Sequence, residues 1–355
     1  MIPLTSLDHW IGRRVSGEKA LSPLPRDALS RYQLERLREL VDYVRERSPF
    51  YRRLLNAFAG RDLNRLNDLE GLPFTTSRDL QADPLQFLCV SRGEIERVVS
   101  LPPASPGVAP KRLHFTREEL ERTVDFFHHG MSTLVGNGER VGILLPGDTP
   151  DSVGDLLSRG LRRLSVDTHI LGPVLNPDQT ATFIRTKKLS CLVGLPNQIL
   201  TLARLPGGSG LAEWISSVLL CSEAAPDTLV QELKKSWDCI VLMHYGLTEA
   251  AYLGGVECRA EHGYHLCEAD LLVEIIDPQT GKAQPEGETG EVVVTTLTRS
   301  AMPLIRYRTG DLSRLLPGTC PCGSILKRLD RVDRRDPEPT ARKGSPGNAG
   351  HRADS

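Results

Sequence analysis

Between residues 141 and 246, short apolar runs alternate with amphipathic segments, and this alternation restricts the fold more than any other feature of the chain. The apolar runs are VGILLP, CLVGLP, VLLCSE and CIVLMHYG, and the segments that follow the first three are DSVGDLLSRGLRRL, NQILTLARL and PDTLVQELKKSW. Strands followed by helices of similar length are typical of βαβ units, whose strands lie parallel. The sequence therefore predicts an α/β fold with a mainly parallel sheet flanked by helices.

A helical pattern precedes this region and an extended pattern follows it. Apolar residues at helical spacing from 28 to 56 predict an amphipathic helix that stops at Ser48-Pro49. Later, DLLVEIIDPQTGKAQPEGETGEVVVTTL predicts two extended segments around turns, and RRDPEPTARKGSPGNAGHRADS predicts disorder because it has no large apolar residue. We therefore expect an N-terminal helical part over 1–95, an α/β core over 96–253, a β-rich subregion over 254–335 and a disordered tail over 336–355.

Composition and charge are those of an ordinary globular protein. The 355 residues are 39% hydrophobic and 25% charged, with a net charge of −1, which gives no reason to expect nucleic acid or an anionic membrane as a partner. The apolar runs are too short to span a bilayer, and the start of the sequence lacks the pattern of a secretory signal. We therefore expect a cytoplasmic protein, in which the eight cysteines do not form a disulfide scaffold.

A group of polar residues follows the last predicted parallel strand. The segment CIVLMHYGLTEA places Tyr245, Gly246, Thr248 and Glu249 just past the strand end, where α/β proteins bind ligands. There a tyrosine can stack on a base, a glycine lets the backbone approach a phosphate, a threonine can donate to it, and a glutamate can hold Mg²⁺. The same residues also fit an ordinary strand-to-helix turn with a threonine cap, and taken alone they favour that interpretation.

A second segment, PLIRYRTGDLSRL, places Asp311 in a loop after a strand, where a carboxylate can bind both hydroxyls of a ribose. Together, HYGLTE and RYRTGD resemble the adenylate-forming superfamily, and within it the phenylacetate–CoA ligase-like branch. Further stretches resemble that branch in the same order, from about residue 8 to 335: SPFYRRLL, LPFTTSRDL, FLCVSRGEIERVVSL, KRLHFT, GVECRAEHGYH, LLVEIIDPQTG, GETGEVVVTTLTRSAMPLIRYRTGDL and PGTCPCG.

The resemblance implies a large N-terminal adenylating domain joined by a hinge to a small, mobile C-terminal domain. In the family this small domain carries the lysine that promotes adenylation and the surface for the thioester step. Here Asp336-Pro337 stands at the acidic hinge position and the disordered tail follows, so we expect no small C-terminal domain in this sequence. A truncated sequence and a lid supplied by a partner chain both stay open.

The resemblance also assigns roles to residues of the adenosine and metal sites. By position, Tyr245 matches the adenine-stacking residue, Thr248 the phosphate contact, Glu249 the Mg²⁺ carboxylate and Asp311 the ribose ligand.

Three further residues match nucleotide-binding positions of the family, and in each segment a neighbouring residue differs from the family pattern. Ser222 and Glu223 lie where the family has an adenine-binding Gly-Ala-Glu-Pro loop, although Cys221 replaces the usual glycine. Arg335 falls at the ribose-binding arginine, although Arg334 replaces the glycine before it.

The stretch LPPASPGVAPK stands where relatives have a phosphate-binding loop like Thr-Ser-Gly-Thr-Thr-Gly-x-Pro-Lys. A phosphate cradle needs inward-turned N–H groups and glycines that tolerate positive φ. Pro106 has no backbone N–H to donate, and Val108 disfavours positive φ. Ser105 and Lys111 are the polar residues that remain in this stretch. We therefore expect a weak grip on the β- and γ-phosphates.

Three cysteines and a histidine form a possible metal-binding set. Cys258 and His265 lie in ECRAEHGYH, and Cys320 and Cys322 flank a proline later in the chain; three thiolates and an imidazole suit tetrahedral Zn²⁺. Some relatives carry a zinc with such ligands, so we expect a structural zinc site that holds the β-rich subregion together. His262 and Cys267 are competing ligands, and a Cys-Pro-Cys turn without metal is the alternative.

The segment FFHHGM, residues 126–131, resembles the aromatic helix that lines the acid pocket in relatives. Adjacent histidines on a helix point in different directions, so His128 and His129 are interpreted as solvated or packing residues. Phe126, Phe127 and Gly130 are interpreted as pocket or core.

These observations predict ATP-dependent, Mg²⁺-assisted adenylation of a carboxylate, expected to be an aromatic acid, with impairment by the altered phosphate loop. A catalytically inactive AMP- or ligand-binding homologue is the competing hypothesis. The expected partners are a small-molecule carboxylate and an adenine nucleotide; CoA as a further substrate and a homodimer stay open.

Overall fold

The computed structural model describes residues 3–17, 24–58, 63–103, 107, 109–221 and 225–334. Its helices are α1 (Ser6–Ser16), α2 (Arg26–Arg47), α3 (Pro49–Leu54), α4 (Ser77–Ala82), α5 (Arg117–Met131), α6 (Val153–Arg162), α7 (Pro177–Lys187), α8 (Pro196–Ala203) and α9 (Asp227–Trp237). Short 3₁₀ helices are η1 (Asn56–Phe58), η2 (Leu66–Gly71), η3 (Pro84–Phe87), η4 (Arg92–Glu94), η5 (Gly208–Glu213) and η6 (Thr248–Ala250).

The strands form three sheets in the described part of the chain. The largest has the order β13-β14-β9-β8-β7-β6-β5-β3-β4, another has the order β10-β11-β12-β15, and β1 pairs with β2. The strands are β1 (Ile95–Leu101), β2 (Lys111–Thr116), β3 (Arg140–Ile143), β4 (Asp167–Ile170), β5 (Cys191–Gly194), β6 (Ser217–Cys221), β7 (Ile240–Gly246), β8 (Gly254–Glu257), β9 (Tyr264–Leu266), β10 (Leu271–Ile276), β11 (Gly290–Thr296), β12 (Tyr307–Ser313), β13 (Leu315–Leu316), β14 (Arg328–Leu329) and β15 (Asp333–Arg334).

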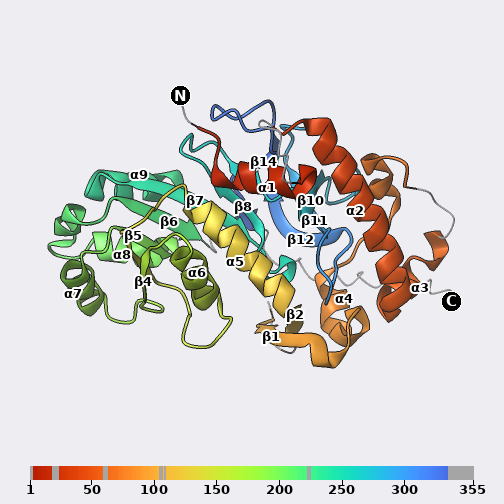
Figure 1. The fold of residues 1–355 in the computed structure, drawn as a ribbon, viewed down its shortest axis with the longest axis horizontal. Coiled ribbons are helices and arrows are strands. Elements are labelled where there is room, and N and C mark those ends of the chain that lie inside the picture. The colour runs from red at the N-terminus through yellow and green to blue at the C-terminus, as the bar shows by residue number, and fades with distance from the viewer. Residues whose placement is uncertain are drawn as a thin grey trace, which may run out of the picture.

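The predicted α/β fold with a mainly parallel sheet is confirmed. Strands β4, β3, β5, β6 and β7 pair in parallel, and β8, β9, β14 and β13 extend the same sheet antiparallel. All residues of β5 and β6 are buried, as expected for central parallel strands covered by helices on both faces. Figure 1 shows α6, α7, α8 and α9 gathered around these strands, with α5 running beside β7 and β8 toward β1 and β2.

Two local features explain how helices around this sheet begin and pack. Helix α5 starts at a capping box, in which Thr116 and Glu119 each accept a hydrogen bond from the other's backbone N–H. Gly160 lets α6 approach α5 closely, because a Cβ at this position would lie 2.9 Å from the carbonyl oxygen of Val124. Glycine is therefore needed where the two helices cross.

The predicted stop at Ser48-Pro49 is the boundary between two helices. Ser48 ends α2 and also caps α3, where its hydroxyl accepts the N–H of Tyr51 at 3.3 Å and Pro49 occupies the first turn. The chain thus resumes a helix after the interruption, which the amphipathic pattern alone does not indicate.

The two extended segments predicted after residue 254 pair with each other as β10 and β11, with Leu271 opposite Thr296. Strands from the predicted β-rich subregion divide between the two larger sheets, since β8, β9, β13 and β14 join the large one. Helix α7 and strand β4 have no counterpart in the sequence prediction. Strand β4 reads DTHI, which lacks the continuous apolar run that marks the central strands.

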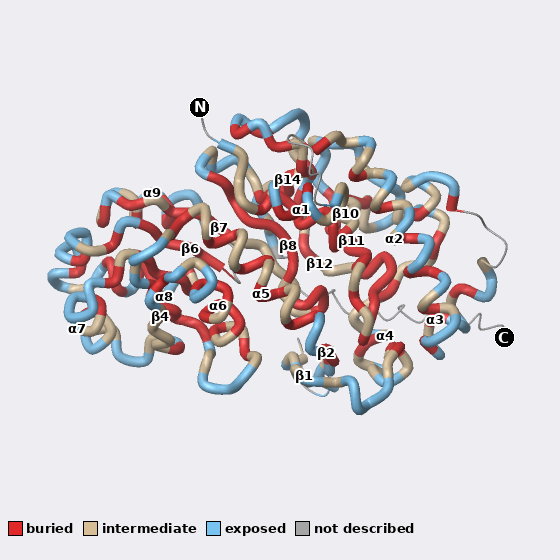
Figure 2. Tube along the Cα trace, viewed as in Figure 1, coloured by how far each residue is buried: buried red, intermediate tan, exposed pale blue. Residues whose placement is uncertain are grey.

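The buried core follows the sheets through the middle of the molecule, as Figure 2 shows, while α7 and the loops around it are largely exposed. Within the described residues, no helix combines the length and the apolar character that a membrane crossing requires.

Candidate active site

Strand β7 and the 3₁₀ helix that follows it carry the first group of predicted residues. Tyr245 and Gly246 end β7, and Thr248 and Glu249 begin η6. Strand β7 pairs with β6 on one side and β8 on the other. The predicted residues therefore lie at the carboxyl end of a central strand, the edge at which open α/β sheets bind ligands.

Lys111, at the start of β2, reaches this strand end and forms an ion pair with Glu249. The Lys111 ammonium also donates to the hydroxyl of Tyr307 at 3.3 Å, and the Tyr307 hydroxyl donates to Glu249 Oε1 at 3.0 Å. The side chains of Lys111 and Glu249 are only 16% and 9% exposed, so water screens this pair poorly. Burial, with the charge of Glu249, raises the pKa of Tyr307 well above its usual value, so its hydroxyl stays a donor.

Strand β12 brings a second pair together beside the first. The Tyr245 hydroxyl donates to Asp311 Oδ2 at 2.9 Å. Burial and the neighbouring carboxylate of Asp311 raise the pKa of Tyr245 well above its usual value. Because β12 carries both Tyr307 and Asp311, the two segments predicted to act together are held side by side by two hydrogen bonds.

The buried side chain of Arg299 contacts the backbone of the site. Arg299 pairs with Glu119 at 3.3 Å, donates to the carbonyl oxygen of His114 at 2.7 Å, and also donates to the carbonyl oxygen of Glu249. Its side chain and that of Glu119 are each 2% exposed. Arg299 therefore ties α5, β2 and η6 together and fixes the backbone that carries Glu249.

An apolar cavity of about 200 Å³ adjoins the same strand end. Its walls come from α5, α6 and the carboxyl ends of β5, β6 and β7, and they include Phe126, Phe127 and Gly130, which the sequence interpretation placed in a pocket or the core. Gly246 and Thr248 also line it, so the cavity opens next to the polar site. Its lining residues are Phe126, Phe127, Gly130, Met131, Leu145, Val153, Leu157, Val193, Leu219, Cys221, His244, Gly246, Thr248, Tyr252 and Val256.

Several predicted residues lie outside the part of the chain that the structure describes. These are Ser222, Glu223 and Arg335 of the nucleotide site and Ser105 of the phosphate loop. Within that loop Gly107 is described, and its φ of 84° is a conformation that favours glycine.

Comparison with known proteins identifies the family. The AMP-binding enzyme family model matches residues 166–299. Phenylacetate-coenzyme A ligase of Thermus thermophilus is 33% identical over 329 residues, which are 88% of this chain and 71% of that protein. The chain belongs to the phenylacetate–CoA ligase family of adenylate-forming enzymes. The protein of the same name from Escherichia coli is 27% identical over 330 residues, or 87% of this chain and 71% of that protein.

Solved structures show the same fold. An open conformation of 2-hydroxyisobutyryl-CoA ligase in complex with 2-HIB-AMP and CoA matches with a TM-score of 0.77 at 20% identity, over 88% of this chain and 71% of that one. The same ligase in the thioesterification state matches with a TM-score of 0.78 over 91% of this chain and 70% of that one, at 20% identity. At this identity the likeness concerns the fold.

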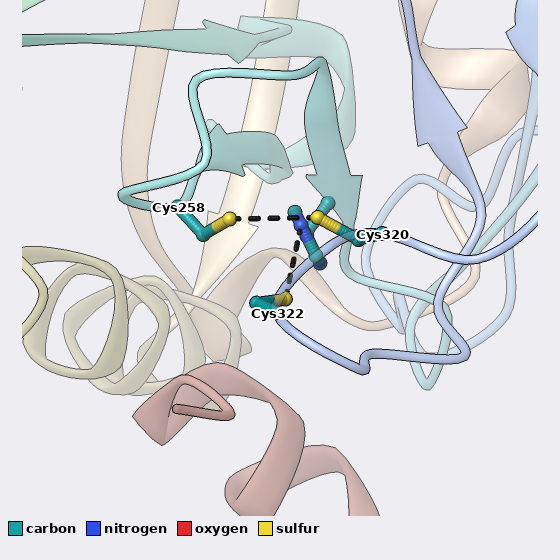
Figure 3. Close-up of side chains that lie close together, drawn as sticks. Cys258, Cys320 and Cys322 are labelled. Atoms are coloured by element: carbon teal, nitrogen blue, oxygen red, sulfur yellow. Dashed lines mark hydrogen bonds between the residues drawn. The ribbon is translucent and has the colours of Figure 1, made fainter. Parts of the chain in front are cut away.

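The four residues predicted to bind zinc form a second cluster, although they come from separate segments of the sequence. Cys258 follows β8, His265 lies in β9, and Cys320 and Cys322 lie in the turn between β13 and β14. All four are buried, and their ligand atoms lie within 4.8 Å of one another. Figure 3 shows the sulfur atoms of Cys258, Cys320 and Cys322 turned toward a common centre.

The spacing of these atoms suits a tetrahedral metal ion. The Sγ atoms of Cys258 and Cys320 are 3.6 Å apart, and Cys322 Sγ lies 3.9 Å from His265 Nε2. Zn–S bonds of about 2.3 Å in a tetrahedron give an S–S separation of about 3.8 Å. The turn is closed by Gly323, whose N–H donates to the carbonyl oxygen of Cys320 at 2.8 Å.

The two competing ligands lie apart from this centre. His262 is exposed, and the Cys267 thiol donates to Asp270 Oδ2 at 3.1 Å. Among the described residues, the metal-compatible group contains Cys258, His265, Cys320 and Cys322 alone.

The sequence interpretation missed three residues that complete the site. Tyr307 is part of the quoted RYRTGD stretch, whose Asp311 alone received a role. Arg299 and Glu119 carry no local motif, and their pairing depends on the packing of α5 against the loop after β11. A charged residue within an otherwise apolar or small-residue stretch is the signal that could have marked Arg299.

Proposed function

We propose that this chain binds ATP and a carboxylic acid and joins them as an acyl-adenylate with release of pyrophosphate. The observation that carries this proposal is the buried Lys111–Glu249 pair with Tyr307, beside the Tyr245–Asp311 hydrogen bond and next to an apolar cavity. Relatives named as acid–CoA ligases support the same reaction class. A nucleotide site and a pocket for an acyl group at one strand end are what such a reaction needs.

In this reaction a carboxylate oxygen attacks the α-phosphorus of ATP and forms a new C(O)O–P bond. The bond between the α-phosphorus and the oxygen that bridges to the β-phosphate breaks, and its electron pair leaves with pyrophosphate. The Lys111 ammonium offsets negative charge on the phosphates, and the Thr248 hydroxyl donates to the α-phosphate. Both effects stabilise the charge that develops in the transition state.

Glu249 is the residue proposed to hold magnesium. Mg²⁺ takes oxygen ligands and is often bound by one or two carboxylates together with substrate phosphates, so one buried glutamate is a fitting protein ligand. When bound there, the ion would neutralise phosphate charge. Tyr307 and the Lys111 ammonium, both at Oε1, orient the carboxylate for this role.

Asp311 and Tyr245 are proposed to bind the adenosine part. The Asp311 carboxylate would accept hydrogen bonds from the ribose hydroxyls, while the ring of Tyr245 would stack on the base. The hydrogen bond between them at 2.9 Å fixes both groups before the nucleotide arrives. Ser222, Glu223 and Arg335 are proposed to contribute further contacts on the strength of the family resemblance alone.

A different class of function competes with this one. Pro103, Pro106 and Val108 in the phosphate loop weaken the grip on the triphosphate, which favours a protein that binds AMP or a related ligand without catalysis. An adenylating part that needs a small domain from a partner chain is a third hypothesis. The chain spans 71% of the relatives named above, and whether thioester formation with CoA follows adenylation stays a proposal.

Exchange of labelled pyrophosphate into ATP, over a panel of aromatic acids, tests the adenylation proposal. We expect acid-dependent exchange that is slow in comparison with the relatives, because the altered phosphate loop weakens the grip on the triphosphate. Binding of AMP is measured in parallel by calorimetry. No exchange with any acid while AMP still binds would contradict adenylation and favour the non-catalytic function.

We also propose that Cys258, His265, Cys320 and Cys322 bind a structural Zn²⁺. The burial of the four residues and the close approach of their ligand atoms, all within 4.8 Å of one another, support this. A closed site with four protein ligands leaves no position for substrate, so the ion would hold β8, β9 and the β13–β14 turn together and take no part in the reaction.

A further inference from the structure

The turn that follows η6 has an unusual backbone for its sequence. Ala251 and Tyr252 have φ values of 57° and 61°, and they are the one consecutive pair of non-glycine residues with positive φ in the described part of the chain. Residues that carry a Cβ disfavour this conformation, and a turn that requires it normally uses glycine. The turn comes directly after Thr248 and Glu249, so an unfavourable backbone conformation lies at the edge of the proposed active site.

Hydrogen bonds hold this turn in its conformation. The N–H of Tyr252 donates to the carbonyl oxygen of Leu247 at 2.8 Å. The N–H of Ala251 donates to the carbonyl oxygen of Thr248 at 3.0 Å, and the carbonyl oxygen of Ala251 accepts from the hydroxyl of Thr123 on α5 at 2.7 Å. At positions 251 and 252 these bonds use backbone atoms, and a glycine at 252 would form the same bond. The tyrosine side chain therefore calls for a separate reason.

The side chain of Tyr252 forms part of the wall of the apolar cavity. Its ring packs near that of Phe115, with 6.1 Å between the ring centroids and 18° between the ring planes. Phe115 is fully buried in β2, whereas Tyr252 is partly exposed. Burial raises the pKa of Tyr252 above its usual value, so its hydroxyl is uncharged near pH 7. The ring is therefore a neutral wall that the core supports and that stays partly accessible.

A large side chain in the wall matters because the cavity is small. Its volume is about 200 Å³, and apolar cavities of about 150 Å³ in proteins bind benzene. The tyrosine ring is itself a substituted benzene, so replacing it with the hydrogen atom of glycine would enlarge the cavity substantially. Protein interiors are closely packed, so a ligand that fills the cavity is limited by its largest wall residues.

We propose that Tyr252 determines specificity by limiting the size of the acyl group that the cavity accepts, and that its positive φ is the conformation that directs the ring to the cavity wall. That an acyl group occupies the cavity rests on the proposed function. The unfavourable backbone then has a functional reason, because glycine would suit the turn better but would leave the wall open. Acids too large for the remaining space are excluded by steric overlap with the ring.

Titration calorimetry with straight-chain carboxylates, from butyrate to decanoate, tests the limit on size. Each added methylene should increase the affinity about fourfold until the cavity is full. An alkyl chain is flexible and can enter space freed at any part of the wall, so this increase should continue to longer acids in Tyr252→Gly. Tyr252→Phe keeps the ring and should show the same limit as the wild type.

Thermal unfolding tests the role of the backbone conformation. Tyr252→Gly and Tyr252→Ala both remove the ring, but alanine keeps a Cβ at positive φ. We expect the glycine variant to unfold at a temperature roughly 1–3 °C higher than the alanine variant. Asp238→Gly is the matched control, because it replaces an exposed residue with a φ of 48° that does not line the cavity. It should leave the limit on chain length unchanged.

If removal of the ring prevents folding, Tyr252→Leu, which is smaller than tyrosine and keeps an apolar side chain, provides the comparison. An affinity that stops rising at the same chain length in the wild type and in the smaller variants would overturn the inference. A glycine variant that unfolds no higher than the alanine variant would overturn the role of the backbone. Pyrophosphate exchange with the same acids separates the two proposals. Exchange with an unchanged limit contradicts only the role of Tyr252, whereas a shifted binding limit without exchange contradicts only adenylation.

Discussion

Lys111 forms a buried ion pair with Glu249, although the two residues are 138 positions apart in the chain. The pair joins the start of β2 to the 3₁₀ helix after β7. It places the lysine that follows the altered phosphate loop directly beside the carboxylate proposed to hold magnesium. The ammonium can therefore share its charge between Glu249 and the phosphates of a nucleotide, even though the loop before it lacks the usual glycines.

The losses of stability caused by removing the two members of this pair should not be additive. In Lys111→Met the buried Glu249 carboxylate loses its cation, and we expect the free energy of unfolding to fall by roughly 1–3 kcal/mol. The double variant Lys111→Met/Glu249→Gln should lose less than the sum of the single variants, which denaturant titration measures. Additive losses would show that the two side chains do not interact. Lys187→Met, at an exposed lysine remote from the site, is the control.

Asp311 should matter more than the Tyr245 hydroxyl for nucleotide affinity. Asp311→Asn removes the negative acceptor proposed for the ribose hydroxyls, and we expect AMP to bind roughly 10- to 100-fold more weakly. Tyr245→Phe keeps the ring that would stack on the base and should weaken binding by about threefold or less. Calorimetry with AMP measures both, with Asp330→Asn, at a half-buried residue paired with Arg314, as the control. A larger effect for Tyr245→Phe would contradict the assignment of Asp311.

The cysteine cluster should contain one zinc ion for each chain. Elemental analysis of the purified protein is expected to find stoichiometric zinc that is absent from Cys320→Ser. Because the proposed metal would link two strands and a turn, the variant should also lose more than about 3 kcal/mol of unfolding free energy. Cys239→Ser, at a buried cysteine outside the cluster, should keep its zinc. A wild-type protein without zinc would end this proposal.

The parts of the site that lie in continuous motifs could be predicted from the sequence, and the contacts between them could not. Tyr245 and Glu249 stand at a strand end that apolar periodicity and the family resemblance both mark. The prediction that Asp311 lies in a loop after a strand was wrong, because Asp311 lies within β12, where it pairs with Arg334 of β15. The contact of Lys111 with Glu249 depends on how β2, in a separate two-stranded sheet, docks against the large sheet. Such docking is decided by tertiary packing, for which local residue patterns carry little information.

The same contrast holds for the fold. Strands β5 and β6 are recognisable in the sequence because they are buried on both faces and therefore consist mostly of apolar residues. The edge strand β4 and helix α7 were missed because their sequences mix polar and apolar residues without a strong period. The four residues proposed to bind zinc show the intermediate case, since residue chemistry suggested the set and the pairing of β9 with β14 helps to bring it together.

His244 should make stability depend on pH in the acidic range. Its pKa is lowered to about 4 in the folded protein, below its ordinary value of 6.5. Between these values the unfolded chain binds a proton that the folded protein does not, so the folded state loses stability as pH falls from 6.5 toward 4. We expect His244→Gln to remove roughly 1–3 kcal/mol of this loss. Denaturant titrations of both proteins at pH 7 and pH 4.5 measure the difference, and parallel pH profiles would contradict it.

Arg299 should be necessary for the geometry of the site although it does not contact substrate. Arg299→Met leaves Glu119 buried without its cation and frees the backbone of Glu249, so we expect a loss of roughly 3–5 kcal/mol in unfolding free energy. Arg299→Lys keeps the charge and should lose less stability. In the folded fraction, AMP affinity should change less than exchange activity does, because Arg299 positions Glu249 and not the adenosine ligands.

Transfer of oxygen from the acid to the nucleotide tests the adenylation proposal most directly. The protein is incubated with ATP, magnesium, hydroxylamine and an aromatic acid labelled with ¹⁸O in its carboxylate, and the nucleotide product is analysed by mass spectrometry. Because a carboxylate oxygen attacks the α-phosphorus, we predict AMP that carries one ¹⁸O atom, with formation strongly reduced in Glu249→Gln. AMP without the label, or no AMP above the background of Glu249→Gln, would contradict adenylation by this site.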